Sequence, residues 1–183
     1  MTRGHASRSG IPDGAAPTAR AGATNLPPVI RPPSDEDTRL LDRGIGEILR
    51  LMREDLVMDI VLVTVHDGDD VVVRHATSCP GEAGIEGLTH PREESICQRV
   101  LQGRLPAIIP DVAALGRTHD VPRTPIVPGA FMAAPVVLKS GRLYGVLCCL
   151  NFEAMPDLDE RHHQRLRMSA EHIARLVDEA GER

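Results

Sequence analysis

The stretch FMAAPVVLKSGRLYGVLCCLNF, residues 131–152, decides the fold. Two apolar runs in it are separated by the turn Lys139-Ser140-Gly141. Apolar runs of about eight residues, rich in Val and Leu and broken by a glycine-containing turn, are typical of a β-hairpin. Neither run alternates cleanly between apolar and polar residues, which indicates strands covered on both faces. The sequence therefore predicts a hairpin at the centre of a sheet, with further layers on both of its sides.

On the N-terminal side of this hairpin, two patterns predict a helix followed by a second hairpin. Apolar residues recur at helical spacing over residues 35–55, so we expect one amphipathic helix there. Two apolar strands, 59–66 and 70–76, flank Asp67-Gly68-Asp69, and an Asp-Gly pair is a strong hairpin-turn signal. The predicted sheet thus gains two strands and a covering helix.

Shorter elements fill the region between the two hairpins. A polar loop over residues 77–92 is expected to lead into a short helix over 93–102. The segment LPAIIP, residues 105–110, predicts a further short strand, and Asp111 directly after it can cap a helical turn. Three prolines in residues 116–130 favour an irregular loop before the central hairpin.

A long helix is predicted after the central hairpin, with Asp157 and Glu160 as an Asp-x-x-Glu capping box at its start. Adjacent His162 and His163 are expected on its polar face. Its apolar stripe consists of Leu166, Ala170, Ile173, Val177 and Ala180. These steps are close to a coiled-coil seam, which would suit a homodimer through the terminal helices, residues 38–56 included. The alternative is a monomer whose stripe packs only on its own sheet.

Composition narrows the classes of function. The 183 residues suffice for one domain with a full core, and a net charge of −5 argues against a nucleic-acid-binding surface. No run of about 18 apolar residues occurs, so we expect no membrane-spanning segment. The four cysteines form no CxxC pair, which favours a reduced, cytoplasmic protein. No histidine pattern predicts a metal site.

Residues 1–33 differ in composition from the rest of the chain. They hold six of the fifteen prolines, and four Arg against the single Asp13 give this segment a net charge of +3. They contain too little apolar surface to offset the entropy of ordering. We therefore predict a disordered tail over residues 1–33 and one folded domain over residues 34–183.

Three segments, in chain order, resemble the motifs of the GAF domain family. ESICQRV, residues 94–100, is similar to the family's Ser-aromatic-Cys helix start, with an isoleucine at the aromatic position. GRLPAIIPD, residues 103–111, resembles its G-x-x-P-x-x-x-x-D strand. Ala134-Pro135-Val136, followed by GRLYGVLCC at residues 141–149, resembles its hairpin signature. The resemblance covers about residues 36–180. It implies an α+β fold with an antiparallel sheet of five or six strands, terminal helices on one face, and short helices and loops over a pocket on the other.

The resemblance also implies a regulatory function. The chain is most similar to bacterial GAF modules attached to cyclic-di-GMP turnover domains or histidine kinases, which bind a small ligand or dimerise. We therefore expect a non-catalytic sensor in bacterial signal transduction that acts on a separate output protein, a cyclic-di-GMP enzyme or a kinase. Residues 112–130 lack the cysteine that bilin-binding relatives use, and the Asn-Lys-Phe-Asp-Glu set of cyclic-nucleotide-binding relatives is not found. The sequence does not identify the small-molecule ligand or any cofactor.

Within this framework, one face of the last predicted strand should meet the ligand. The candidate ligand-binding residues are Cys97, Asp111, His119, Phe131, Tyr144, Val146, Cys148 and Leu150. On the strand itself, alternation places Tyr144, Val146, Cys148 and Leu150 on one face, and Leu143, Gly145, Leu147 and Cys149 on the other. The resemblance to bilin-binding relatives implies that the face with Tyr144 meets the pocket. Gly145 would then let a terminal helix approach the sheet closely.

Other interpretations of these residues stay open. Cys97, near a helix start, has the position of a low-pKa thiol, but a free cysteine is also a common small core residue. Asp111 can be a turn cap, and His90 and His119 can be solvated loop residues. The alternative function is a thiol-dependent enzyme resembling GAF-type free methionine sulfoxide reductase. Its Cys-Gly motif is absent, and LCCLN, residues 147–151, stands in place of its L-D-hydrophobic-D-S strand.

Overall fold

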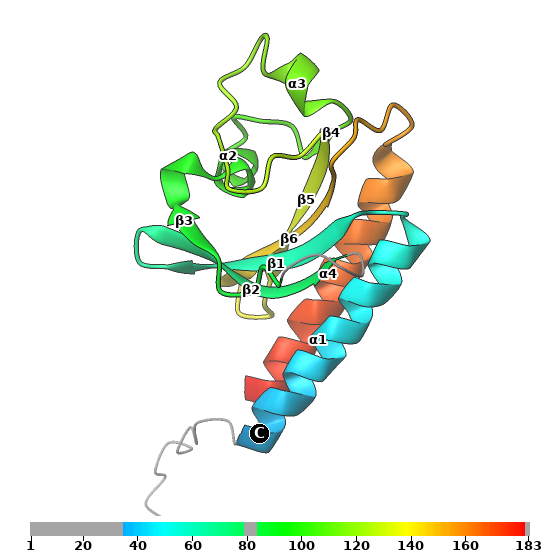
Figure 1. Ribbon diagram of the computed structural model, residues 1–183. Helices are drawn as coiled ribbons and strands as arrows, with labels where there is room; N and C mark the ends of the chain where they lie inside the picture. The colour runs from blue at the N-terminus through cyan, green and yellow to red at the C-terminus, as the bar shows by residue number, and fades with distance from the viewer. Residues whose placement is uncertain (1–34, 79–83, 182–183) are drawn as a thin grey trace, which may run out of the picture. The chain divides into compact units, whose positions relative to one another are not determined.

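The computed structural model describes residues 35–78 and 84–181 (Figure 1). The predicted tail, residues 1–33, lies outside this part of the chain. No helix among the described residues is both long and apolar enough to cross a membrane.

Six strands form one antiparallel sheet in the order β3-β2-β1-β6-β5-β4. In chain order they are β1 Ile60–Asp67, β2 Asp70–Ser78, β3 Thr89–Pro91, β4 Ile108–Ile109, β5 Ala130–Val137 and β6 Leu143–Asn151. The predicted central hairpin is β5–β6, and β6 pairs with β1 in the middle of the sheet. This confirms the sheet expected from the sequence. The edge strand β3 was missed there, because its three residues lie in a segment with the composition of a polar loop.

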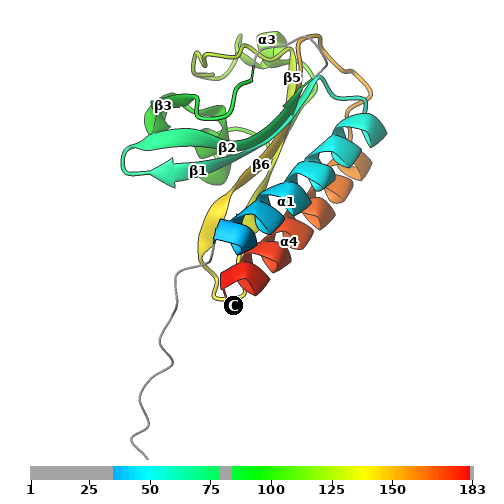
Figure 2. The same ribbon diagram turned by 60° about the horizontal axis from the view of Figure 1, so that its bottom comes forward.

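Helices cover both faces of this sheet. The two long helices, α1 Asp35–Asp55 and α4 Glu160–Gly181, lie side by side on one face, with the start of α1 near the end of α4 (Figure 2). The other face carries a 3₁₀ turn at Arg92–Glu94 and two short helices, α2 Ile96–Leu101 and α3 Val112–Leu115 (Figure 1). The α+β architecture predicted from the sequence is therefore confirmed.

Each face of the sheet has its own apolar cluster. Leu147 and Cys149 of β6 belong to the helix-side cluster, and Val146 and Cys148 to the cluster on the opposite face. The stripe of α4 packs in the helix-side cluster, where Leu166, Ala170 and Ile173 are at most 1% exposed in a single chain. These three residues therefore pack on their own sheet, as in the monomer alternative, and a dimer would have to use other residues of the helices.

The alternation of β6 breaks at Tyr144. Val136 pairs with Gly145, and Val137 pairs with Leu143, so Tyr144 is an extra residue opposite β5. Its side chain packs against the helix-side cluster, away from Val146. The structure thus corrects the face predicted for Tyr144, because an inserted bulge residue reverses the alternation on which that prediction relied.

Gly145 permits a close approach of two strands, not of a helix and the sheet. A Cβ atom at this position would lie 2.2 Å from the carbonyl oxygen of Thr64 on β1. The pairing of β1 with β6 ends at Thr64 and Val146, directly before this contact. The role predicted for Gly145 in helix packing is therefore wrong, because the backbone of β1 already occupies the space beside it.

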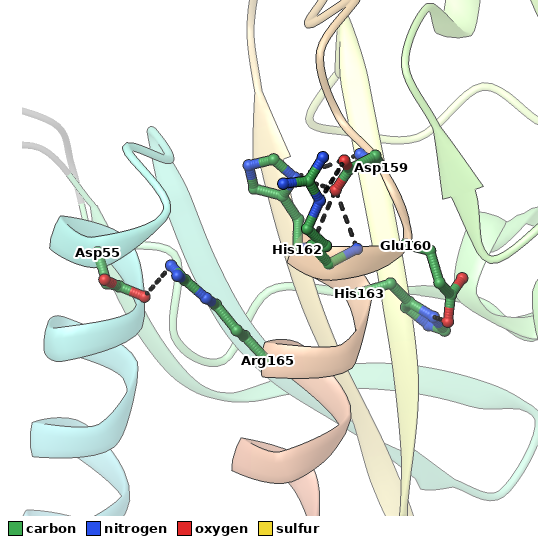
Figure 3. A network of polar contacts seen from close by, with 7 residues as sticks. Asp55, Asp159, Glu160, His162, His163 and Arg165 are labelled. Carbon is green, nitrogen blue, oxygen red and sulfur yellow. Dashed lines mark hydrogen bonds and ion pairs between the residues drawn. The ribbon is translucent and has the colours of Figure 1, made fainter.

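The start of α4 is capped by Asp159 instead of the predicted Asp157 (Figure 3). Asp159 Oδ1 accepts hydrogen bonds from the backbone N–H groups of Arg161 at 2.9 Å and His162 at 3.3 Å. These bonds satisfy helix N–H groups that have no partner within the helix. The hydrogen bond from the His162 side chain, followed by these backbone bonds, lowers the pKa of the Asp159 carboxyl.

His163 lies in the core, not on the polar face that helical periodicity predicted. Its Nε2 donates to the carbonyl oxygen of Ala133 on β5 at 2.9 Å. Its Nδ1 lies 3.7 Å from a carboxylate oxygen of Glu160, and Figure 3 shows these two side chains next to each other. The hydrogen bond to Ala133 compensates the imidazole for its loss of water. His163 therefore connects α4 to the sheet, a role that a periodicity count cannot show because it treats every histidine as polar.

Candidate ligand-binding site

A cavity of about 50 Å³ lies on the face of the sheet opposite the two long helices. It is bounded by the sheet, by α2 and by the segment 124–128. Its lining residues are Leu62, Thr64, Val73, Leu88, His90, Ser95, Ile96, Cys97, Thr124, Pro125, Ile126, Pro128, Phe131, Cys148 and Leu150. Most are apolar, and the polar atoms come from a few hydroxyl groups, two thiols and one imidazole. Such a lining suits a small and largely apolar molecule with few polar groups.

The wall formed by α2 is held by local sequence signals. Ser95 is the N-cap residue, and its hydroxyl oxygen accepts from the backbone N–H of Gln98 at 3.4 Å. Beyond the helix, Gly103 has φ of +68°, a conformation that favours glycine. Arg99 donates to both the carboxylate and the carbonyl oxygen of Asp120, which ties α2 to the following loop. Cys97 is thereby directed inward, and its side chain is largely buried.

Two thiols from distant segments meet in the wall of the cavity. Cys97 Sγ on α2 lies 2.9 Å from Cys148 Sγ on β6. The hydrogen bond with Cys148 lowers the pKa of the Cys97 thiol, burial opposes this, and Ser95 and Thr64 add to the lowering. Burial raises the pKa of Cys148 well above its usual value. Cys97 is thus the thiol of the pair that more readily becomes a thiolate.

His90 on β3 presents its imidazole to the same cavity. Both ring nitrogens are shielded from solvent, and neither has a hydrogen-bond partner within residues 35–78 and 84–181. Burial lowers the pKa of His90, so the ring is neutral at pH 7. Buried polar nitrogens without partners are costly, and they are commonly matched by a ligand or by ordered water. His90 is therefore the strongest polar feature of the site.

The structure brings together some of the residues predicted for the site and separates others. Cys97, Phe131, Cys148 and Leu150 line the cavity. Val146 belongs to the apolar cluster around the cavity without lining it. Tyr144 lies on the helix side of the sheet, as described above.

The two remaining predicted residues lie at the surface. Asp111 is exposed and caps α3, where its carboxylate accepts from the backbone N–H of Ala114 at 2.8 Å. His119 is exposed, and its Nδ1 lies 2.9 Å from the hydroxyl oxygen of Thr118. Neither lines the cavity.

Several residues that line the cavity were not predicted from the sequence. His90 was placed in a loop expected over the pocket and interpreted as a solvated residue, because nothing in its local sequence shows that β3 pairs with β2 over the cavity. Thr64 stands in a run of Val and Leu and is 4% exposed, so only the sheet register reveals which face its hydroxyl occupies. Ile126, an apolar residue within a proline-rich loop, was a local signal of a segment that packs inward.

The described residues contain no group of three or more His, Cys, Asp or Glu side chains arranged to hold a metal ion.

Comparison with known families gives a direct assignment. The family model described as "GAF domain" matches residues 38–178. Because this match spans most of the chain, the protein belongs to the GAF domain family. A search of curated proteins finds no match.

Solved structures share the fold at low sequence identity. A methyl-accepting chemotaxis protein, residues 122 to 287, superposes with a TM-score of 0.64 and 15% identity, covering 80% of this chain and 96% of that one. The GAF domain of Acinetobacter phosphoenolpyruvate-protein phosphotransferase gives 0.58 and 15%, with coverage of 81% and 96%. The GAF-B domain of DevS from Mycobacterium smegmatis gives 0.59 and 13%, with coverage of 77% and 96%. At these identities the likeness establishes the fold alone.

Proposed function

We propose that this protein is a non-catalytic sensory module that binds a small molecule in the cavity beneath α2 and regulates a signalling partner. The observation that carries the proposal is the cavity itself, with apolar walls and the unpartnered imidazole of His90. A ligand with an apolar body and one neutral polar group would occupy the space and supply the missing hydrogen bond to His90. GAF domains of the signalling proteins named above share this fold, which supports a regulatory role.

Native mass spectrometry of the freshly purified protein tests ligand binding. We expect a co-purified small molecule that is released on denaturation. Replacing His90 with Leu should reduce its occupancy at least tenfold, because the ligand loses its polar contact while the cavity keeps its apolar walls. His119→Leu is the matched control, since His119 is exposed and outside the cavity. A protein that carries no molecule, and whose melting temperature no member of a small-molecule panel raises, would refute ligand binding.

The module is further proposed to work as a homodimer in the bacterial cytoplasm. Apolar side chains on the outer surfaces of the terminal helices support this assembly: Leu40 and Leu51 of α1 are 50% and 55% exposed, and Met168 of α4 is 61% exposed. Pairing of these surfaces between two copies would bury them and would connect ligand state to helix position. A separate cyclic-di-GMP enzyme or kinase would receive the signal.

Sedimentation of the full chain at micromolar concentration tests the dimer. We expect a species of twice the 19.8 kDa chain mass. Leu51→Glu should shift it to the monomer without unfolding, because Leu51 is exposed in a single chain. A wild-type species of about 20 kDa at all concentrations would show that the chain does not dimerise through these helices.

A further inference from the structure

Cys97 and Cys148 form a pair that sequence spacing does not reveal. They are 51 residues apart in the chain, and one lies on α2 while the other lies on β6. Their sulfur atoms are nonetheless 2.9 Å apart, close enough that a bond between them requires only a small movement of the side chains. Both are free thiols.

The cavity gives a small oxidant access to this pair. All three cysteines are buried from bulk solvent, but Cys97 and Cys148 line the cavity, whereas the neighbouring Cys149 faces the helix-side cluster. A volume of about 50 Å³ exceeds the roughly 10–15 Å³ that one water molecule requires. The two oxygen atoms of hydrogen peroxide therefore fit beside the sulfur atoms.

We propose that Cys97 and Cys148 are a redox-active dithiol, which hydrogen peroxide oxidises to an intramolecular disulfide and which thiol reductants restore. The pair would make this wall of the cavity a site of reversible covalent modification. The proposal is independent of whether the cavity also binds a ligand.

The reaction takes place in two balanced steps. The Cys97 thiolate attacks one peroxide oxygen, so that an S–O bond forms and the O–O bond breaks. The departing hydroxide takes up the proton released by Cys97 and becomes water. The sulfur of Cys148 then attacks the Cys97 sulfenic acid, so that the S–S bond forms and the S–O bond breaks. The second hydroxide takes the Cys148 proton, and the sum is two thiols and one peroxide giving one disulfide and two waters.

The surroundings of the two thiols assign them different roles. Hydrogen bonding lowers the pKa of Cys97, with Cys148 as the main partner and Ser95 and Thr64 as further ones. Burial raises the pKa of Cys148. Cys97 therefore acts as the attacking nucleophile, and Cys148 as the thiol that resolves the sulfenic acid.

Disulfide formation would change the cavity directly. The bond would fasten α2 to β6 and would close a covalent loop from Cys97 to Cys148. Because both sulfur atoms lie in the cavity wall, their approach would reshape the space that the imidazole of His90 also faces.

Peptide mapping tests the proposal on the full chain. The reduced protein is treated with graded hydrogen peroxide, its remaining thiols are blocked with N-ethylmaleimide, and it is digested with trypsin. We expect residues 93–99 linked to residues 143–161, and loss of this species after dithiothreitol. Because the second peptide holds both Cys148 and Cys149, the same mapping on Cys149→Ser identifies the partner, and this variant should still form the link.

Cys97→Ser and Cys148→Ser should each abolish the linked species. The wild-type result alone tests whether the Cys97–Cys148 disulfide forms, even if either variant folds poorly. Failure of wild type to give the 93–99 to 143–161 link, or a link that instead uses Cys79 or Cys149 or joins two chains, would overturn the proposal. So would conversion of Cys97 to sulfinic acid without a disulfide. Since the readout is a covalent bond, its failure is distinct from the absence of a co-purified ligand.

Discussion

The two faces of the sheet carry similarly apolar residues but are covered in different ways. On one face, helices of 21 and 22 residues cover the sheet, and the side chains beneath them are almost fully buried. On the other, α2 and α3 have six and four residues, and irregular segments complete the cover. Long regular helices can close a face without gaps, whereas short elements and loops leave space between side chains. The cavity, the unpartnered His90 and the thiol pair are all on the second face.

The two faces of the sheet therefore differ in what they contribute to the domain. Rigid packing on the helix side supplies stability, whereas the cavity side keeps an imidazole with neither nitrogen partnered among the described residues. Proteins commonly depart from ideal packing where they function, because a binding site requires space and unsatisfied polar atoms. The following experiments test this division.

The largest effect is expected from truncating matched leucines on β6. Leu147 is fully buried under the helices, whereas Leu150 lines the cavity. Leu147→Ala should lower the free energy of unfolding by an amount near the top of the range of about 2–5 kcal/mol, and Leu150→Ala by an amount near its bottom. The difference arises because Leu150 already borders empty space. Urea denaturation measures the free energy of unfolding of both variants. Equal losses would contradict the claim that the two faces of the sheet are packed differently.

A smaller loss is expected for Gly145→Ala. The new Cβ would lie 2.2 Å from the backbone oxygen of Thr64, so strands β1 and β6 would have to separate. We expect a loss of about 1–3 kcal/mol in urea denaturation. Gly46→Ala is the matched control, because a Cβ at Gly46 of α1 meets nothing within 4 Å. It should raise stability by up to about 1 kcal/mol through helix propensity. A neutral Gly145→Ala would show that the strands can move apart freely.

Acidification should reduce stability through histidines on both faces whose pKa is lowered by burial, chiefly His75 and His90. Burial lowers the pKa of His75, which lies near Asp42 of α1, and of His90 in the cavity. In the unfolded chain both have a pKa of about 6.5, so below this pH the unfolded state takes up protons that the folded state does not. The free energy of unfolding should therefore fall as pH decreases from 7 to 5, by at most about 1.4 kcal/mol per pH unit for each histidine.

Urea denaturation at several pH values measures this dependence, and NMR titration measures each pKa. His75→Leu and His90→Leu should each remove part of the slope. A wild-type stability that increases toward pH 5 would contradict the prediction.

The smallest effect is expected from removal of residues 1–33. Their composition offers no apolar face for the domain to bury, so the melting temperature and oligomeric state should not change. Calorimetry and sedimentation of the shortened chain test this. A fall of several degrees would show that the segment contributes to the packing of the domain.

Patterns that depend on near neighbours in the chain were sufficient to predict most of the fold. The apolar runs of β5 and β6 and the 3.6-residue periodicity of α1 and α4 each reflect burial against a large surface, so they gave the hairpin and both long helices with nearly correct ends. The cap at Asp111 was also predicted, because it depends on residues only three apart.

Features that depend on distant segments were not predictable in the same way. The contact of Cys97 with Cys148, and that of His163 with Ala133, join residues 51 and 30 positions apart. The inserted residue at Tyr144 leaves no signature in composition. As a result the sequence identified part of the cavity wall, such as Phe131 and Leu150, but not His90, whose position depends on the pairing of β3.

The short edge strands have a consequence for solubility. β3 ends in Pro91, and Pro106 and Pro110 flank β4, so neither edge offers a long row of backbone groups to another chain. Where β5 extends past β4, Ala133 still donates to the carbonyl oxygen of Ala107, and two residues further along the same edge Pro135 has no N–H to donate. Because an unpaired strand edge is the usual template for fibril growth, the short edge strands and these prolines limit edge-to-edge pairing where they lie.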